Sequence, residues 1–540
     1  MEKKSSFVGG AAILAAAGLI VRIIGAVYRI PLANIVGVDG MRYYQIVYPY
    51  YSALLVISSS GLPTAISKMV SERVTLGDYR GARAVFRTAF RLLCVIGVVT
   101  ALFMLLGADL LAGLSYPDSA QEEVAKQALA FRAMSPALLF VSLLCAYRGY
   151  LQGMQLMTGT ALSQIVEQVG KLAVGFTLAS YLLERGPEYA AMGALIGVSA
   201  SELLALISIF IVYRRRKPQL DERIKRAPKM QKGWNFSSIS KRLMAIAIPV
   251  TIGASVMPLT GIVDSAMIIN TLESIGYSVE QAGEAYSLLS ANVTPLVNMP
   301  AVLTVALAMS LVPAISSYMA KKEYRQVQNA ARTGLKLSLI IGTPCAVGLF
   351  VMAEPILKML YTSLNQTQLT LAAGLLQTAC IGVVFLSLVQ TLTGVIQGLG
   401  KPNVPVLNLM FGGILKVVSL AILTRRPEIN IQGAAVSTVV CYATAAILDC
   451  IYLVRKTNMK LNVLDVFVKP VFASALMGIS VHFLYKAFMS AELSSTVATL
   501  AAVMVGVLVY GACIVVLRMF SKADLAFIPG GHKLLRFAKQ

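Results

Sequence analysis

The sequence has little charge for its length. Asp, Glu, Lys and Arg make up 13% of the 540 residues, whereas soluble domains carry about 25%. Hydrophobic residues account for 57% of the chain, and the mean hydropathy is +0.74. A composition this apolar excludes a soluble enzyme, a secreted disulfide scaffold and a disordered protein. It indicates a polytopic membrane protein.

Residues for metal, haem or covalent chemistry are also scarce. The chain has two histidines, His482 and His532, and its seven cysteines lie in apolar stretches without a CxxC pair. We interpret the cysteines as small buried hydrophobic residues. The phosphate loop GxxxxGK[ST] and the motifs G-x-S-x-G and H-E-x-x-H are missing as well. The sequence therefore predicts neither an enzyme nor a bound cofactor, and leaves a coupling cation open.

Acidic residues are outnumbered by basic ones. Lys and Arg total 47 against 25 Asp and Glu, which gives a net charge of +22. The basic residues form short runs between apolar stretches and do not alternate with aromatic residues as in a nucleic-acid surface. We therefore expect no nucleic-acid partner, and we interpret the basic runs through the positive-inside rule.

Long apolar stretches fill most of the chain. A bilayer core is crossed by about 20 apolar residues in a helix, and fourteen stretches approach or exceed that length. They lie at 7–35, 43–69, 85–112, 127–151, 158–183, 189–213, 242–270, 284–319, 330–357, 367–397, 403–424, 432–454, 464–489 and 494–518. We expect about fourteen transmembrane helices and no cleavable signal peptide.

Basic residues collect in alternate loops. The segment 214–241 carries the longest basic run, whereas 113–126 and 271–283 are mainly acidic, and the pair Arg425-Arg426 breaks the alternation. The positive-inside rule places 214–241 in the cytoplasm. An even number of spans then places both termini there too, in a protein of the plasma membrane.

One part of the sequence recurs 245 residues later. Gly149-Tyr150-Leu151-Gln152-Gly153 returns as Gly394-Val395-Ile396-Gln397-Gly398, and Lys171 falls on Lys416 at the same offset. The segment 62–67 also resembles 312–316 with a small insertion. Chance similarity among helices rich in Gly and Leu is the alternative. Because the offset spans six helices, the halves would be parallel repeats.

The repeat predicts an all-α architecture of two parallel six-helix lobes followed by two C-terminal helices. The first lobe would occupy 1–213 and the second 242–456. A basic cytoplasmic connector at 214–241 would join them, and 457–540 would hold the last two spans and a basic tail. Two equivalent lobes around a central cavity are typical of alternating-access transporters.

Arginines in the first span are the strongest candidates for a binding site. Ionisable residues within a span normally face a cavity or a partner. Arg22 and Arg29 are seven residues apart, so they share one helical face, about 10 Å apart along the axis. Two planar guanidinium groups suit a pyrophosphate. Alternatively, Arg29 extends to the outer interface.

Further polar residues lie in other predicted spans. Asp264 could pair with an arginine, bind a cation or contact sugar hydroxyls, or it could form a structural ion pair. Asn298 lies in a stretch bent by Pro295 and Pro300, and Gln45 accompanies a group of tyrosines that could stack on sugars or mark the membrane interface. We interpret Glu167 and Lys171 as an i,i+4 pair that neutralises itself, with Lys416 as the counterpart of Lys171.

Several of these segments resemble a known family. The run from Gly18 to Leu32 resembles the first span of the polysaccharide-transport and stage V sporulation protein B families, as do segments 61–68 and 149–153. These families belong to the multidrug/oligosaccharidyl-lipid/polysaccharide exporter superfamily, which includes MurJ-type lipid II flippases. The resemblance implies that Arg22 and Arg29 line the cavity. Ser58-Ser59-Ser60 departs from the basic second span of the MurJ-type relatives.

The resemblance implies a flippase that moves an undecaprenyl-pyrophosphate-linked oligosaccharide, the peptidoglycan precursor lipid II being our leading choice, from the inner to the outer leaflet. The alternatives are a cation-coupled multidrug exporter of the same fold, a glycan polymerase and a non-transporting membrane scaffold. Arg22, Arg29, Asp264, Asn298 and Gln45 are the predicted substrate contacts. Membrane lipids and cell-envelope synthesis proteins are the expected partners.

The predicted topology can be tested by labelling. Cysteines introduced at Ser119 and Ser237 should lie outside and inside the cell, respectively, because their loops differ in basic residues. In intact cells, an impermeant thiol reagent should label only the variant at position 119. Labelling at position 237 alone would reverse the orientation.

Overall fold

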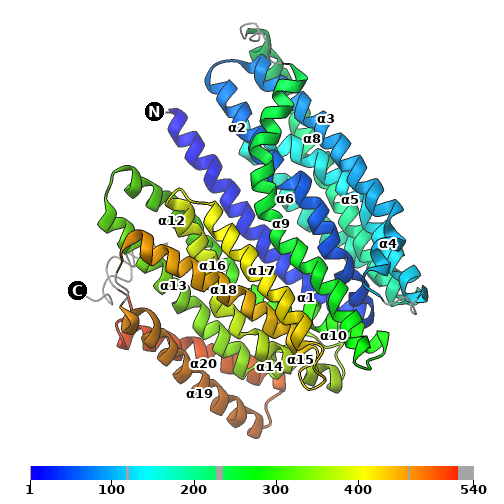
Figure 1. Ribbon diagram of the computed structural model, residues 1–540, viewed down its shortest axis with the longest axis vertical. Helices are drawn as coiled ribbons and strands as arrows, with labels where there is room; N and C mark the ends of the chain where they lie inside the picture. The colour runs from blue at the N-terminus through cyan, green and yellow to red at the C-terminus, as the bar shows by residue number, and fades with distance from the viewer. Residues whose placement is uncertain (1, 117–120, 227–234, 460–461, 521–540) are drawn as a thin grey trace. The chain divides into compact units, whose positions relative to one another are not determined.

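The computed structural model consists of helices and loops, without a strand in the described residues. Those are all residues except 1, 117–120, 227–234, 460–461 and 521–540, and the side chains of 2–16, 19, 22, 23, 26 and 27 are also outside the description. The chain divides into two compact units (Figure 1). Unit 1 comprises 1–270 and 278–284, and unit 2 comprises 271–277 and 285–540.

The helices follow one another with short connections. The first unit takes its helices from α1 (Glu2–Ser59), α2 (Gly61–Thr75), α3 (Tyr79–Leu106), α4 (Ala108–Gly113), α5 (Gln121–Gly153), α6 (Met157–Gly170), η1 (Lys171–Gly175), α7 (Phe176–Leu182), η2 (Leu183–Arg185), α8 (Pro187–Arg226), α9 (Phe236–Ser274) and α10 (Val279–Ser287). The second contains η3 (Leu288–Val293), α11 (Thr294–Asn298), α12 (Ala301–Ala320), α13 (Tyr324–Val351), α14 (Ala353–Leu360), α15 (Gln366–Ala379), α16 (Ile381–Gly398), α17 (Asn403–Leu423), α18 (Gln432–Thr457), η4 (Leu464–Val468), α19 (Lys469–Ser490) and α20 (Ser495–Val516).

Each apolar stretch predicted from the sequence coincides with one helix or a run of consecutive helices. Within the described residues, twelve helices are long and apolar enough to cross a membrane. The other two stretches are the first, which lies partly outside the description, and 158–183, where Glu167 and Lys171 lower the hydropathy. The predicted all-α polytopic fold is confirmed.

The predicted lobe boundaries at 213, 242 and 456 stay a prediction. The compact units place most of α9 with the residues that precede it, whereas the repeat assigns α9 to the second half of the chain.

A glycine divides α1 into two rods. Gly37 has φ 72° and ψ 172°, a conformation that glycine adopts easily because it has no Cβ. The helical path is interrupted there, between the predicted spans at 7–35 and 43–69. The second rod leads directly into α2.

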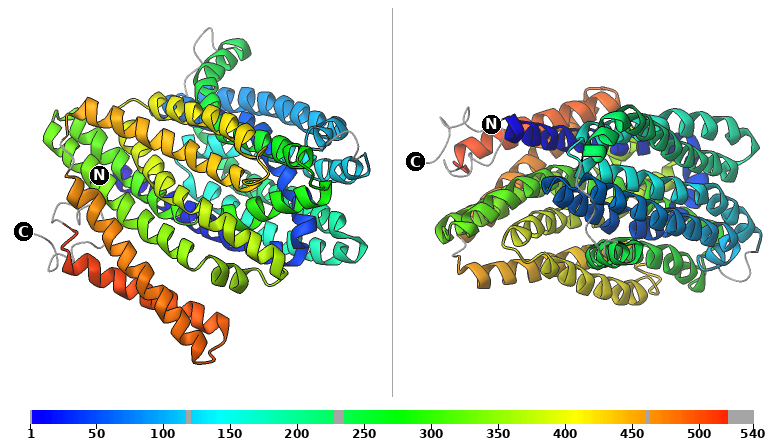
Figure 2. Two further views of the ribbon diagram at one scale, coloured as in Figure 1. Left: turned by 60° about the horizontal axis from the view of Figure 1, so that its bottom comes forward. Right: turned by 90° about the horizontal axis from the view of Figure 1, so that it is seen from above.

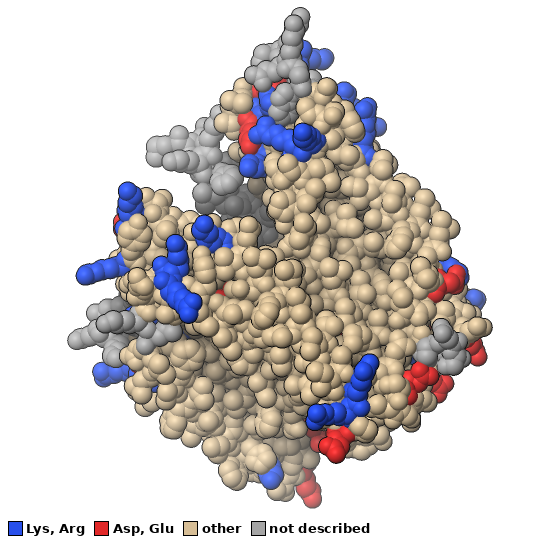
Figure 3. Space-filling model, in the orientation of Figure 1, with Lys and Arg blue, Asp and Glu red and all other residues tan. Residues whose placement is uncertain are grey.

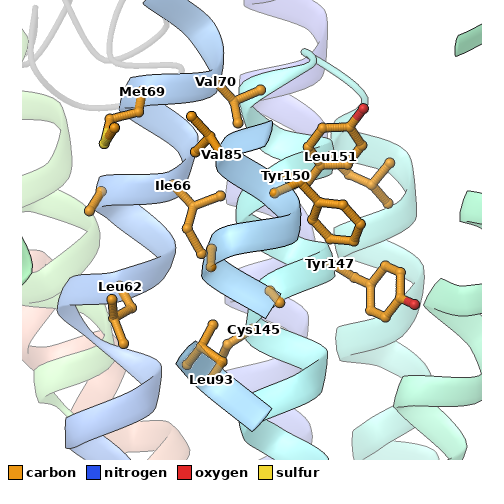
Figure 4. Packing of buried hydrophobic residues seen from close by; sticks show 14 of the residues in the cluster. Leu62, Ile66, Met69, Val70, Val85, Leu93, Cys145, Tyr147, Tyr150 and Leu151 are labelled. Atoms are coloured by element: carbon orange, nitrogen blue, oxygen red, sulfur yellow. The ribbon is translucent and has the colours of Figure 1, made fainter. Parts of the chain in front are cut away.

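Glycines bring helix backbones into contact in unit 1. A Cβ atom placed on Gly149 would lie 3.0 Å from the carbonyl oxygen of Pro63, and one on Gly153 would lie 2.8 Å from that of Ser67. These contacts set the register of α5 against α2. Figure 4 shows the apolar side chains that pack around them, with labels on Leu62, Ile66, Met69, Val70, Val85, Leu93, Cys145, Tyr147, Tyr150 and Leu151.

Unit 2 repeats these contacts between α16 and α12. A Cβ atom on Gly394 would lie 2.9 Å from the carbonyl oxygen of Ala308, and one on Gly398 would lie 3.1 Å from that of Val312. All four residues are 245 positions beyond their equivalents in unit 1. The contacts therefore align 62–67 with 307–312, and the small insertion expected from sequence similarity is wrong, because backbone packing sets the register.

The outer faces of the helices are apolar. On α3, the side chains of Val95, Val99 and Phe103 are more than half exposed, although the inner face of the same helix contacts Ser142 through Gly97. Small residues inside and large apolar residues outside are typical of helices in lipid. The surface of α3 thus fits a membrane-facing position.

The last two helices pack together and against α13. Figures 1 and 2 show α19 and α20 as a neighbouring pair. Ser474 of α19 donates a hydrogen bond to the Thr343 hydroxyl at 2.9 Å, and Tyr510 of α20 donates one to the Ile340 carbonyl at 2.9 Å. These bonds attach the pair to unit 2.

The glycine contacts predict opposite effects of alanine substitutions. Gly153→Ala and Gly398→Ala should each destabilise the protein by about 1–3 kcal/mol, because the added methyl overlaps packed atoms. Gly511→Ala is the control, since its Cβ would meet nothing within 4 Å, and it should be neutral or stabilise by up to about 1 kcal/mol. Thermal unfolding of the purified proteins in detergent measures the difference. Equal melting temperatures in all three variants would contradict the packing role of Gly153 and Gly398.

Candidate functional site

A row of aromatic rings lies on the second rod of α1. Tyr44 stacks on Tyr48 with 5.7 Å between ring centroids, and Tyr48 lies 6.0 Å from Tyr51. The spacing of four and three residues places these rings on one helical face. The guanidinium carbon of Arg29, on the first rod, lies 5.7 Å from the centre of the Tyr48 ring. Arg29 therefore joins the two rods across Gly37.

The helix formed by α6, η1 and α7 runs along the first rod. Tyr28 stacks on Phe176 at 5.1 Å, and Gly175 makes room for the Tyr28 hydroxyl, which would lie 2.8 Å from a Cβ atom at that position. Farther along the same contact, Gln168 approaches Gly25. The α6–α7 segment and the first rod of α1 therefore contact each other from Gln168 to Phe176.

Four charged side chains form a buried network beside this contact. Glu167 accepts hydrogen bonds from Lys171 at 2.8 Å and from Arg148 at 3.1 Å. Lys171 also lies 3.5 Å from a carboxylate oxygen of Glu202. The side chains are 5–15% exposed, and they come from α5, α6, η1 and α8. The network holds two positive and two negative groups.

The network and the tyrosines belong to one region. Glu167 and Lys171 lie on the same helical segment as Gln168 and Gly175, which contact Gly25 and Tyr28. Arg29, next to Tyr28, lies over the Tyr48 ring. We call this region the polar wall of unit 1. It is formed by Tyr28, Arg29, Tyr44, Tyr48, Tyr51, Arg148, Glu167, Lys171 and Glu202.

Several buried polar atoms of this region have no hydrogen-bond partner in the described part of the chain. They are the Tyr28 hydroxyl, Oε1 of Gln164 and Oε2 of Glu202. An unsatisfied buried polar atom costs about 1–3 kcal/mol. These atoms retain hydrogen-bonding capacity that no described protein group uses.

The backbone is irregular where Lys171 enters the wall. Residues Lys171–Gly175 form a π-helical turn between α6 and α7. Such turns insert a residue into an α-helix and often occur at functional sites. The turn begins at Lys171, which belongs to the charge network, and ends at Gly175, which leaves room for the Tyr28 hydroxyl.

The charges of the polar wall are specific to unit 1. At the repeat offset of 245, Lys171 corresponds to Lys416, but Glu167 corresponds to Gly412 and Arg148 to Thr393. The glycine contacts between helices repeat, whereas these charges do not. A purely structural network would be expected in both halves.

The predicted site residues are spread over both units. Arg29 belongs to the polar wall, whereas the side chain of Arg22 lies outside the described residues. Gln45 is half-buried beside Tyr44. Asp264 is half-buried on α9, one turn beyond Gly261, which contacts Pro49 of α1. These residues share unit 1.

Asn298 lies elsewhere in the chain. It is exposed at the last residue of α11 in unit 2, so it is not grouped with the polar wall within one unit. The substrate contacts assigned to Arg22, Arg29, Gln45, Asp264 and Asn298 stay predictions.

Sequence reasoning missed two members of the network, Arg148 and Glu202. Both are ionisable residues inside predicted spans, which is the signal that could have identified them. Glu167 and Lys171 were expected to neutralise each other, but Lys171 also approaches Glu202, and Arg148 approaches Glu167.

The described residues contain no group of three or more His, Cys, Asp or Glu side chains placed to hold a metal ion. What the polar wall offers instead is aromatic faces, paired charges and hydrogen-bonding atoms. These groups can bind a ligand reversibly.

Known families and proteins resemble this chain over much of its length. The family model "Polysaccharide biosynthesis protein" matches residues 7–319, and the MatE model matches 290–422. Stage V sporulation protein B of Bacillus subtilis (strain 168) is 27% identical over 437 residues, 81% of each chain. The lipid II flippase MurJ of the same strain is 25% identical over 553 residues, 99% of each chain.

A solved structure shows the same fold. The lipid II flippase MurJ in an inward closed conformation has a TM-score of 0.68 at 14% identity, covering 94% of this chain and 98% of that one. The polysaccharide family model alone spans more than half of the 540 residues. The chain therefore belongs to the polysaccharide biosynthesis protein family, within the multidrug/oligosaccharidyl-lipid/polysaccharide exporter superfamily.

Proposed function

We propose that this membrane transporter is a flippase for an undecaprenyl-pyrophosphate-linked oligosaccharide of the lipid II type. It moves the substrate from the inner to the outer leaflet by alternating access and catalyses no covalent reaction. The observation that carries the proposal is Arg29, which faces the Tyr48 ring and has no acidic partner among the described residues. Its charge is available to an anionic ligand.

The composition of the polar wall supports a glycolipid. Tyr48 is half-buried and is the ring of this row proposed to face a sugar, whereas Tyr44 and Tyr51 are buried beside it. Arg29 lies over Tyr48 and is proposed to bind a phosphate through its planar fork of donors. The resemblance of the first span extends this role to Arg22. Similarity over almost the full length to a protein named lipid II flippase supports the same substrate class.

A cation-coupled multidrug exporter is the second candidate, because the MatE model matches 290–422. The charges of the polar wall favour the flippase. Glu167 and Glu202 are balanced by Lys171 and Arg148, so Arg29 leaves the wall with a net positive charge. A cationic drug would be repelled from it.

The proposal extends to further substrate contacts, the orientation in the membrane and the partners. Asp264, Gln45 and Asn298 are proposed to contact substrate. Both termini are proposed to be cytoplasmic in the plasma membrane, and proteins of cell-envelope synthesis are the proposed partners.

Arginine substitutions test the phosphate contacts. Arg22→Ala and Arg29→Ala should each lower substrate affinity about ten- to hundredfold, because a charge-assisted contact contributes about 1.5–3 kcal/mol. Lys at either position keeps the charge but loses the fork, so activity should be intermediate. Transfer of a fluorescent undecaprenyl-pyrophosphate sugar between leaflets of reconstituted vesicles measures the effect.

Arg132→Ala is the matched control, since Arg132 is 43% exposed and pairs with Asp109 away from the polar wall. It should transport normally at equal protein abundance. Full activity in both Arg22→Ala and Arg29→Ala would show that the phosphate is bound elsewhere. If Lys were as effective as Arg at both positions, the arginines would merely be extending to the interface.

Tyrosine substitutions test sugar stacking separately. Tyr48→Phe keeps the aromatic face and should retain most transport. Tyr48→Ala should lower transport several-fold, because an aromatic contact is worth about 0.5–1.5 kcal/mol beyond its buried area. The same vesicle assay with the sugar-free lipid pyrophosphate should be less sensitive to Tyr48→Ala. Equal losses with both lipids would argue against stacking.

A further inference from the structure

A cavity lies beside α2, away from the polar wall. Gly61 at the start of α2 lies directly against the Ala247 carbonyl of α9. Near the other end of α2, Arg242 of α9 forms an ion pair with Glu72 at 2.7 Å. The cavity has a volume of about 690 Å³ and is lined by Lys68, Ser71, Glu72, Arg73, Thr75, Leu76 and Arg242.

The cavity lining is basic. Lys68, Arg73 and Arg242 face one acid, Glu72. Arg73 is buried and forms an ion pair with Asp78 at 3.0 Å, as Arg242 does with Glu72. Lys68 is exposed and has no ion-pair partner in the part of the chain that the structure describes. The Lys68 ammonium is therefore the cationic donor available to a ligand in the cavity.

A hydroxyl group adds a donor to the cavity. Ser71 and Thr75 lie one turn apart on the same helical face as Lys68. Because Thr75 donates its hydroxyl proton to the Ser71 carbonyl at 2.9 Å, the Ser71 hydroxyl is the donor of this pair that faces a ligand. Lysine, arginine and hydroxyl groups together are typical of phosphate recognition. A phosphate group fits this lining better than an uncharged ligand does.

The cavity belongs to a strongly basic end of unit 1. Residues 68–91, 214–226 and 235–242 contain fifteen Lys and Arg against four Asp and Glu. The end of α8 is fixed to α3 by an ion pair between Asp221 and Arg83 at 3.1 Å and by burial of Leu220. Figure 3 shows several Lys and Arg on the surface at the upper end of the view, with Asp or Glu beside them. The positive-inside rule places this end at the cytoplasmic surface.

An apolar side chain borders the cavity. Leu76 is 74% exposed, and Phe236 at the start of α9 is 47% exposed. A large apolar residue beside cationic donors at the end of a membrane span matches a lipid, whose acyl chain lies next to its headgroup. Basic clusters at the cytoplasmic ends of spans bind anionic lipids.

We propose that this cavity binds the phosphate group of an anionic membrane lipid. The shared chemistry is a phosphodiester or a pyrophosphate on a lipid, and the site is separate from the polar wall. The proposal does not depend on the proposed transport function. Lys68 supplies the charge that binds the phosphate, the ion-paired Arg73 and Arg242 line the cavity beside it, and Leu76 contacts the lipid chain.

Native mass spectrometry of the purified full-length protein tests lipid binding. Phosphatidylglycerol should be retained in preference to phosphatidylcholine. Lys68→Glu should weaken phosphatidylglycerol binding at least fivefold, because each basic residue near an anionic lipid contributes about fivefold. The matched control is Lys321→Glu, an exposed lysine directly after α12 in unit 2, which makes the same charge change and should have little effect.

Two results would overturn the proposal. One is equal retention of phosphatidylglycerol and phosphatidylcholine, and the other is an equal loss in Lys68→Glu and Lys321→Glu, which would indicate unspecific attraction. Thermal stabilisation by inorganic pyrophosphate, measured in the same variants, distinguishes the sources. Stabilisation that is lost in Lys68→Glu supports a pyrophosphate group as ligand. Phosphatidylglycerol binding that is weakened by Leu76→Ser without any effect of pyrophosphate supports a phospholipid.

Discussion

Close backbone contact between helices at glycine positions is the constraint on which the rest of this protein depends. Lipid tails are as apolar as leucine, so burying large side chains contributes little to helix association in a membrane. Gly149 and Gly153 allow α5 to contact α2 directly. Arg148 immediately precedes the first of these contacts. The same register that packs the glycines therefore directs Arg148 toward Glu167.

The two halves use one packing scheme with different polar residues. Contacts of Gly97 with Ser142 and of Gly342 with Ser387 are again 245 residues apart, so the repeat includes α3 and α13. Of the four network positions, only that of Lys171 carries a charged residue in both halves of the sequence, as Lys416 in the second half. The glycine contacts form in unit 2 without these charges, which separates the packing residues from the polar wall of unit 1.

Much of the fold was predictable because its signals are local. Apolar stretches set the helices, and Gly37 falls between two predicted spans. The repeated glycines could be found by their spacing in the sequence. The alignment of 62–67 with 307–312 in the repeat followed only from the packed structure. The charge network could not be derived in this way, because Glu167 and Lys171 form a complete pair within one helix. Arg148 and Glu202 reach them from α5 and α8, and helix packing decides that approach.

The length of α8 has a mechanical consequence. Its 40 residues form a rod of about 60 Å, roughly twice the thickness of the hydrocarbon core. Glu202 lies near the middle of this rod, and Asp221 fastens its far end to α3. Pro218 interrupts the helical hydrogen bonding between these two residues. Because the Asp221–Arg83 ion pair joins this end of α8 to α3, a change in tilt beside the polar wall would move the ends of α8 and α3 together.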